Sequence, residues 1–136
     1  MTNILLIKLG ALGDVLRTTS LVAGLKKKWP EARVTWVVLE NGMPLLCRNP
    51  ELAEIISMDS QKSPHPMTRI AKKEWDVVIN LDEDPQATAL AMSVRATARF
   101  GVGRDKNGRL VSPAPESEIL ISLATNDRLK FRENQM

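Results

Sequence analysis

The chain has 136 residues, of which 43% are hydrophobic and 26% charged; this is the composition of one globular domain and excludes a disordered tail. A net charge of +3 suits an anionic ligand but is too small to indicate nucleic-acid binding, and the chain has no tyrosine and only two phenylalanines for stacking bases. The single cysteine excludes an internal disulfide and a cysteine zinc site, and no apolar run reaches the length of a membrane span. We therefore expect a cytoplasmic protein without a nucleic-acid partner.

Apolar runs alternate with helix-like segments through most of the chain. The apolar runs predict strands, and helical periodicity with boundary residues predicts helices. In chain order we expect a strand at 4–9, a helix at 15–29, a strand at 34–39, a short helix at 42–47, a strand at 54–58, a helix at 67–74, a strand at 75–81, a helix at 86–95, a strand at 99–103 and a turn at 105–109. This alternation predicts an α/β fold: a Rossmann-like open parallel sheet with helices on both faces.

The end of the chain differs from the rest. We expect residues 1–112 to form the Rossmann-like domain. Residues 113–136 are polar apart from one modest apolar cluster and are expected to be a tail that leads toward an absent C-terminal domain.

The first apolar run ends at the turn Gly10-Ala11-Leu12-Gly13, and Asp14 follows where a helix begins. Glycines permit a sharp turn and let a ligand come close to the free N–H groups of the helix. The helix dipole favours the charged form of Asp14, so its carboxylate is well placed to accept a proton. From the spacing alone, a plain N-cap or first-turn role of Asp14 is favoured over a catalytic one, and the two roles can coexist.

Other motifs point away from cofactor and metal sites. The glycine turn lacks the third glycine of a dinucleotide fingerprint and the Gly-Lys-Ser/Thr ending of a phosphate-binding loop. His65, the only histidine, is expected to be a solvated loop residue because no metal-ligand partners accompany it. For the acidic residues 82–84, helix capping is favoured over binding of a divalent cation. We predict no cofactor and no metal.

Ligands of open parallel sheets bind beyond the carboxyl ends of the strands. We expect four segments on that rim, at 10–14, 40–42, 82–84 and 103–106. Among the basic residues, Arg17, Arg104 and Lys106 are those expected to converge there and bind phosphates or carboxylates.

Residues 4–19, ILLIKLGALGDVLRTT, resemble the N-terminus of the lipopolysaccharide heptosyltransferases, glycosyltransferase family 9. The likeness continues through 21–30, 33–40, 75–82 and 100–109. It implies the N-terminal half of a GT-B glycosyltransferase, in which this half binds the sugar acceptor and the other half binds most of the ADP-heptose donor. The implied reaction is an inverting transfer of heptose to a lipopolysaccharide core acceptor that needs no catalytic metal.

The resemblance also implies roles for single residues. The family's catalytic aspartate corresponds to Asp14, which would deprotonate the attacking hydroxyl of the acceptor. Substrate binding is expected at Lys8, Gly10, Gly13, Arg17, Arg104 and Lys106, although Arg17 takes a position that varies among relatives. The implied partners are a sugar-nucleotide donor, an anionic glycolipid acceptor at the inner face of the cytoplasmic membrane, and a chain that supplies the donor half.

The glycine- and histidine-containing donor motifs of the family's second half are missing from the chain. Because an inverting displacement needs donor and acceptor held in line, efficient transfer by this polypeptide alone is not expected. Two alternatives stay open. One is a non-catalytic truncated relic or stand-alone module that binds a glycan or a partner. The other is a nucleotide-binding domain, which an acidic residue at the start of the helix disfavours.

Overall fold

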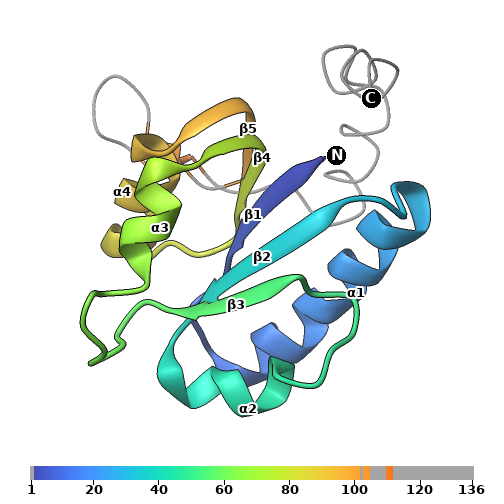
Figure 1. Ribbon diagram of the computed structural model, residues 1–136, viewed down its shortest axis with the longest axis horizontal. Helices are drawn as coiled ribbons and strands as arrows, with labels where there is room; N and C mark the ends of the chain where they lie inside the picture. Colours follow the sequence, from blue (N-terminus) through green and yellow to red (C-terminus); the bar gives the residue numbers. More distant parts are fainter. Residues whose placement is uncertain (1, 102, 105–109, 112–136) are drawn as a thin grey trace.

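The computed structural model describes residues 2–101, 103–104 and 110–111, and its centre is a five-stranded parallel sheet in the order β3-β2-β1-β4-β5 (Figure 1). The strands of this sheet are β1 (Asn3–Ile7), β2 (Arg33–Val38), β3 (Glu54–Ser57), β4 (Glu74–Asn80) and β5 (Arg95–Gly101). The helices are α1 (Leu12–Lys28), η1 (Glu40–Gly42), α2 (Met43–Leu46), α3 (Met67–Lys72) and α4 (Pro85–Ser93). The predicted α/β class and open parallel sheet are confirmed.

Helices cover both faces of the sheet, α1 and α2 on one and α3 and α4 on the other (Figure 1). Successive side chains of β1 alternate between the two layers: Ile4 and Leu6 pack with α1, while Leu5 and Ile7 pack with α3 and α4. A central parallel strand is buried on both faces, which explains why the first apolar run is continuous rather than alternating. None of the helices in the described part of the chain combines the length and apolar character needed to span a bilayer.

Helix α1 begins at Leu12, three residues earlier than predicted, so Gly13 and Asp14 lie in its first turn. The sequence analysis placed Gly13 in the turn and Asp14 at the start of the helix, and glycine is a poor residue for a helix interior. The helix accommodates Gly13 here because the burial of Val15, Leu21 and two further apolar residues on its inner face outweighs that weak local preference.

The boundary between α4 and β5 also differs from the prediction. The helix ends at Ser93 rather than residue 95, and β5 begins at Arg95 rather than residue 99. The segment 96–98 contains two alanines, which favour a helix by propensity. Pairing with β4, which joins Ala96 to Trp75 and Ala98 to Val77, overrides that preference.

The fifth strand ends at Gly101, not at residue 103, because the backbone leaves the sheet there. Gly101 has φ +92°, and a Cβ at this position would lie 2.0 Å from the carbonyl oxygen of Asn80. Residues Gly103–Arg104 (β6) instead pair antiparallel with Leu110–Val111 (β7). The predicted turn at 105–109 and the tail 113–136 lie outside the described residues.

Candidate functional site

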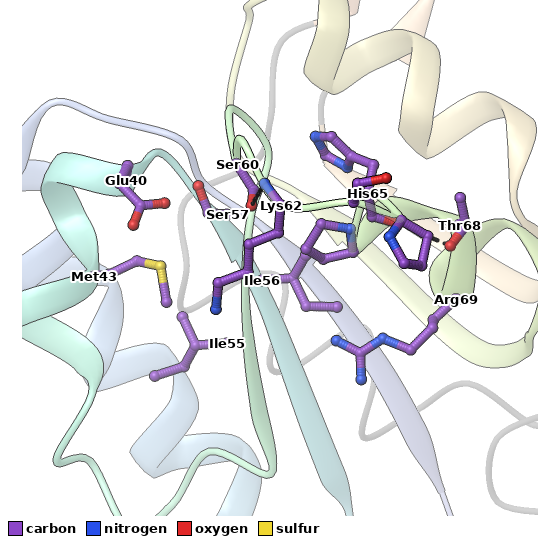
Figure 2. Close-up of a pocket in the computed structure, with 13 residues that line it drawn as sticks. Glu40, Met43, Ile55, Ile56, Ser57, Ser60, Lys62, His65, Thr68 and Arg69 are labelled. Atoms are coloured by element: carbon purple, nitrogen blue, oxygen red, sulfur yellow. Dashed lines mark hydrogen bonds between the residues drawn. The ribbon is translucent and has the colours of Figure 1, made fainter.

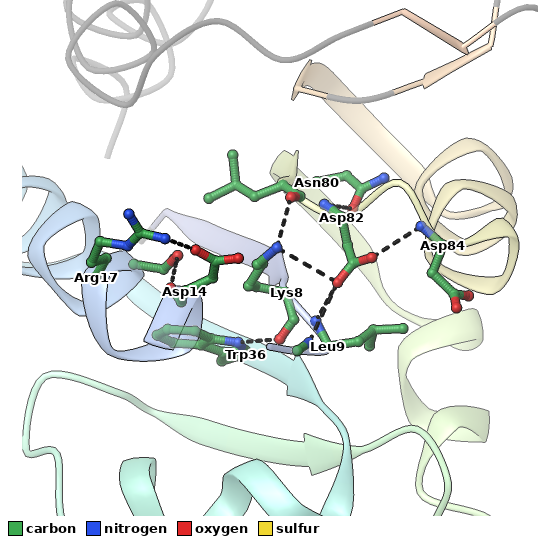
Figure 3. A network of polar contacts seen from close by, with 11 residues as sticks. Lys8, Leu9, Asp14, Arg17, Trp36, Asn80, Asp82 and Asp84 are labelled. Carbon is green, nitrogen blue, oxygen red and sulfur yellow. Dashed lines mark hydrogen bonds and ion pairs between the residues drawn. The ribbon is translucent and has the colours of Figure 1, made fainter. Parts of the chain in front are cut away.

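Strands β1 and β4 are neighbours in the sheet, with Ile7 paired to Asn80. The segments that follow them, 8–14 and 81–84, therefore meet at the carboxyl edge of the sheet, where the sequence predicted them (Figure 3). We call this part of the edge the β1–β4 rim.

Asp14 occupies the third position of α1, and its side chain is 41% exposed. It forms an ion pair with Arg17, one turn further along the helix, whose side chain is 78% exposed (Figure 3). The N-cap of α1 is Ala11, which makes no capping bond with its side chain. Asp14 is therefore a first-turn residue rather than the N-cap, and its carboxylate stands at the surface beside an exposed cation.

The two glycines of the turn are not needed for backbone freedom. Among the described glycines Gly101 is the one with positive φ, so neither Gly10 nor Gly13 adopts a conformation that is restricted to glycine. A Cβ at either position would meet no atom within 4 Å. This open space leaves room for a ligand to approach the backbone closely, which is the other use of glycine.

Lys8 faces inward. Its side chain is 14% exposed, and its ammonium donates to the carbonyl oxygen of Leu81 at 3.3 Å and lies 3.8 Å from Asp82 Oδ2. Its own carbonyl oxygen accepts a bond from Trp36 Nε1 at 3.0 Å. The ammonium of Lys8 is thus bonded within the protein, and its direct contact with a substrate stays a prediction.

Asp82 is the residue that sequence reasoning missed. Its Oδ2 accepts from the amides of Leu9 at 3.0 Å and Gly10 at 3.4 Å, and its Oδ1 accepts from the amide of Asp84 at 2.9 Å. The capping interpretation is confirmed for Asp84, which is the N-cap of α4 and accepts from the amide of Gln86 at 2.8 Å. In the described part of the chain, no group of three or more His, Cys, Asp or Glu side chains could hold a metal ion.

The other predicted basic residues are not brought to the rim by what the structure describes. Arg104 lies in β6, where the backbone alone is described, and Lys106 lies outside the described residues. Their convergence with Arg17 stays a prediction.

A cavity of about 350 Å³ lies over the carboxyl ends of β2 and β3, between η1 and α3 (Figure 2). The sequence did not predict it. Figure 2 shows Lys62 entering from the β3–α3 loop and Arg69 from α3. Arg69 forms an ion pair with Glu54, whereas Lys62 has no ion-pair partner among the described residues. We call this region the β2–β3 cavity.

His65 holds the loop that forms the cavity. Its Nδ1 accepts from the amide of Met67 at 3.1 Å, which assigns the ring proton to Nε2, and Nε2 then donates to the carbonyl oxygen of Met58 at 3.1 Å. His65 is half-buried, so the expectation of a solvated histidine is wrong. Nearby, hydrogen bonds from the Glu40 amide and the Ser57 hydroxyl lower the pKa of Asp59.

No protein-family model matches the chain. It is 23% identical over 97 residues to "Lipopolysaccharide heptosyltransferase 3" of Escherichia coli, a match that covers 65% of this chain and 28% of the relative. A crystal structure of a glycosyl transferase family 9 protein from Veillonella parvula aligns with a TM-score of 0.63 at 27% identity, over 75% of this chain and 32% of that one. E. coli heptosyltransferase WaaC with ADP aligns with a TM-score of 0.62 at 18% identity, over 74% of this chain and 35% of that one.

The chain resembles the family 9 glycosyltransferases. The resemblance expected from residues 4–19 is confirmed in both sequence and fold. The likeness to WaaC, at its lower identity, shows the fold alone. The chain spans about a third of the length of these family 9 relatives.

Proposed function

We propose that the chain is the acceptor-binding part of an inverting glycosyltransferase of lipopolysaccharide core synthesis, and that Asp14 is its general base. The observation that carries the proposal is the exposed Asp14 carboxylate in the first turn of α1, on the edge of the sheet where ligands of this fold class bind. The similarity to heptosyltransferases supplies the reaction class, a transfer of heptose from ADP-heptose.

The chemistry requires one proton acceptor on the acceptor side. As the acceptor oxygen bonds to the anomeric carbon of the donor, Asp14 takes the hydroxyl proton, and the bond between that carbon and the diphosphate oxygen breaks with inversion. Arg17, exposed and paired only through a surface contact, can turn toward a phosphate or carboxylate of the acceptor. The open space over Gly10 and Gly13 lets the acceptor lie against the start of α1.

In this proposal the donor site is formed by residues other than those of this sequence. The matched part of the chain covers about a third of each relative, so we propose that the donor half is supplied by further sequence or by a partner chain. An acceptor anchored in lipid places the reaction at the inner face of the cytoplasmic membrane, where Arg104 and Lys106 would add positive charge.

Calorimetry tests acceptor binding directly. The chain is titrated with a phosphorylated inner-core oligosaccharide, then with ADP and with ADP-heptose. We expect acceptor binding with little nucleotide binding. Nucleotide binding without acceptor binding would overturn the proposal in favour of a nucleotide-binding domain, and no binding of either would favour a non-catalytic relic.

Substitution of Asp14 tests the catalytic role. With the donor half supplied, Asp14→Asn is expected to lower the rate of ADP release by about 10²–10⁴-fold, because proton transfer to the base is lost, while acceptor affinity changes little. Glu83→Gln is the matched control, since Glu83 is an exposed carboxylate of the same rim. Equal rates for the two variants would contradict the assignment of Asp14.

A further inference from the structure

We propose that Asp82 is a positioning residue for Asp14: its carboxylate fixes the backbone that leads into α1 and holds the ammonium of Lys8 away from the Asp14 carboxylate. The role of Asp14 in this statement rests on the proposed function. The action of Asp82 on the β1–α1 turn rests on geometry alone.

The first step is the way Asp82 joins two loops. One oxygen accepts from the amides of Leu9 and Gly10, and the other accepts from the amide of Asp84 in its own loop. The amide of Asp82 in turn donates to the Asn80 side chain at 3.0 Å. Hydrogen bonds to an ionised acceptor are about twice as strong as neutral ones, so this carboxylate is a firm link between the ends of β1 and β4.

The second step is that α1 has little else to set its start. Its N-cap Ala11 offers no side-chain bond, and Gly10 and Gly13 contact nothing at the position of a Cβ. Three other described bonds hold Lys8 and Leu9: Lys8 N–H to the Val37 carbonyl oxygen, Trp36 Nε1 to the Lys8 carbonyl oxygen, and Leu39 N–H to the Leu9 carbonyl oxygen. The bond that reaches Gly10, the residue nearest the helix among these, is the one that its amide donates to Asp82. Asp14 lies one turn beyond these contacts, so its position follows from them.

The third step concerns charge. In Figure 3 the Lys8 side chain lies between Asp14 and Asp82, and its ammonium pairs with Asp82. Both partners of this pair are 14% exposed, so solvent and salt screen it weakly. Asp14 lies on the same rim, so without the charge of Asp82 the ammonium is free to turn toward the Asp14 carboxylate. Asp82 therefore leaves Asp14 with the exposed Arg17 as its partner and accessible to an acceptor.

Amide exchange and carboxyl signals, both measured by NMR on the full chain, test this role. In Asp82→Ala the Leu9 and Gly10 amides are expected to exchange about tenfold faster than the change in global stability explains, and the Asp14 carboxyl carbon signal is expected to shift. Asp82→Asn keeps an oxygen that can accept from Leu9, so it should restore most of the amide protection. It lacks the charge that holds Lys8, so the Asp14 signal should still shift.

Asp84→Ala is the matched control, because it removes a carboxylate of the same loop whose described bond is to Gln86 at the start of α4 and not to the β1–α1 turn. It should leave the Leu9 and Gly10 amides and the Asp14 signal unchanged. Wild-type exchange and an unshifted Asp14 signal in both Asp82 variants would overturn the proposal. Faster exchange of the Leu9 and Gly10 amides together with a shifted Asp14 signal in Asp84→Ala would also overturn it. If Asp82→Ala does not fold, the test is the Asp14 signal in Asp82→Asn: a shifted signal supports the proposal and an unshifted signal overturns it. No readout uses donor or acceptor, so failure here is distinct from failure of the proposed function.

Discussion

The β1–β4 rim and the β2–β3 cavity lie on the same edge of one sheet but are held in different ways. At the rim, the little-exposed pair of Lys8 and Asp82 holds the backbone, and a carboxylate is left at the surface. At the cavity, the neutral ring of His65 holds the loop, and a cation, Lys62, is left without an ion-pair partner among the described residues.

The difference shows how one edge can offer two kinds of chemistry. An exposed carboxylate beside open backbone suits proton acceptance, whereas a cavity that a lysine side chain enters suits contact with an anionic group. The rim is held by an ion pair that solvent and salt screen weakly, whereas the loop of the cavity is held by two hydrogen bonds of His65.

The largest expected effect is at Gly101, which borders the rim through Asn80. Gly101→Ala places a methyl group against the Asn80 carbonyl oxygen at a backbone angle that alanine rarely adopts. We expect a loss of about 2–3 kcal/mol in the free energy of unfolding, measured by urea denaturation. A loss no larger than that of an ordinary surface substitution, about 0.5 kcal/mol, would show that β5 does not need this close approach.

The next effect is at His65, in the cavity. His65→Ala removes a donor to Met58 and an acceptor for the amide of Met67, so we expect a loss of about 1–2 kcal/mol in the free energy of unfolding. Lys62→Ala, on the same loop, is the control and should change stability by less than about 0.5 kcal/mol. Equal losses in the two variants would mean that the histidine does not hold the loop.

The sequence predicted the elements that local pattern determines. The continuous apolar run of β1 and the capping of α4 by Asp84 are each encoded by neighbouring residues. The α4–β5 boundary was wrong because strand pairing overrode the helix propensity of the alanines.

The site was predicted less completely because part of it depends on strand order. Asp14 and the glycines stand together in the chain, so their motif is visible in the sequence. The contact between Asp82 and Leu9 exists because β4 is placed beside β1, and no local pattern determines that placement. The bonds of His65 likewise depend on how a loop folds back on β3, which is why a bonded histidine was taken for a solvated one.

Substitution of Gly13 is expected to have a smaller effect on stability, and it also tests whether a ligand contacts the rim at this residue. Gly13 lies in α1 with open space at the position of a Cβ, so Gly13→Ala should raise the free energy of unfolding by about 0.5–1 kcal/mol. The same methyl group should weaken acceptor binding measured by calorimetry if a ligand lies against the turn. A more stable variant with wild-type acceptor affinity would contradict the close approach proposed for this glycine.

The smallest effect concerns acid at the cavity. Bonds from the Glu40 amide and the Ser57 hydroxyl hold the pKa of Asp59 below its ordinary value in the folded chain. The ionised carboxylate therefore stabilises the fold above its unfolded pKa of about 4, and this contribution disappears as the pH falls through the lower, folded pKa. Because Asp59 is exposed, water weakens the contribution and the effect should be small.

Urea denaturation should show wild type more stable than Asp59→Asn at about pH 6, with the difference shrinking toward about pH 3. A difference that grew in acid would mean that the bonds of Asp59 favour its protonated form.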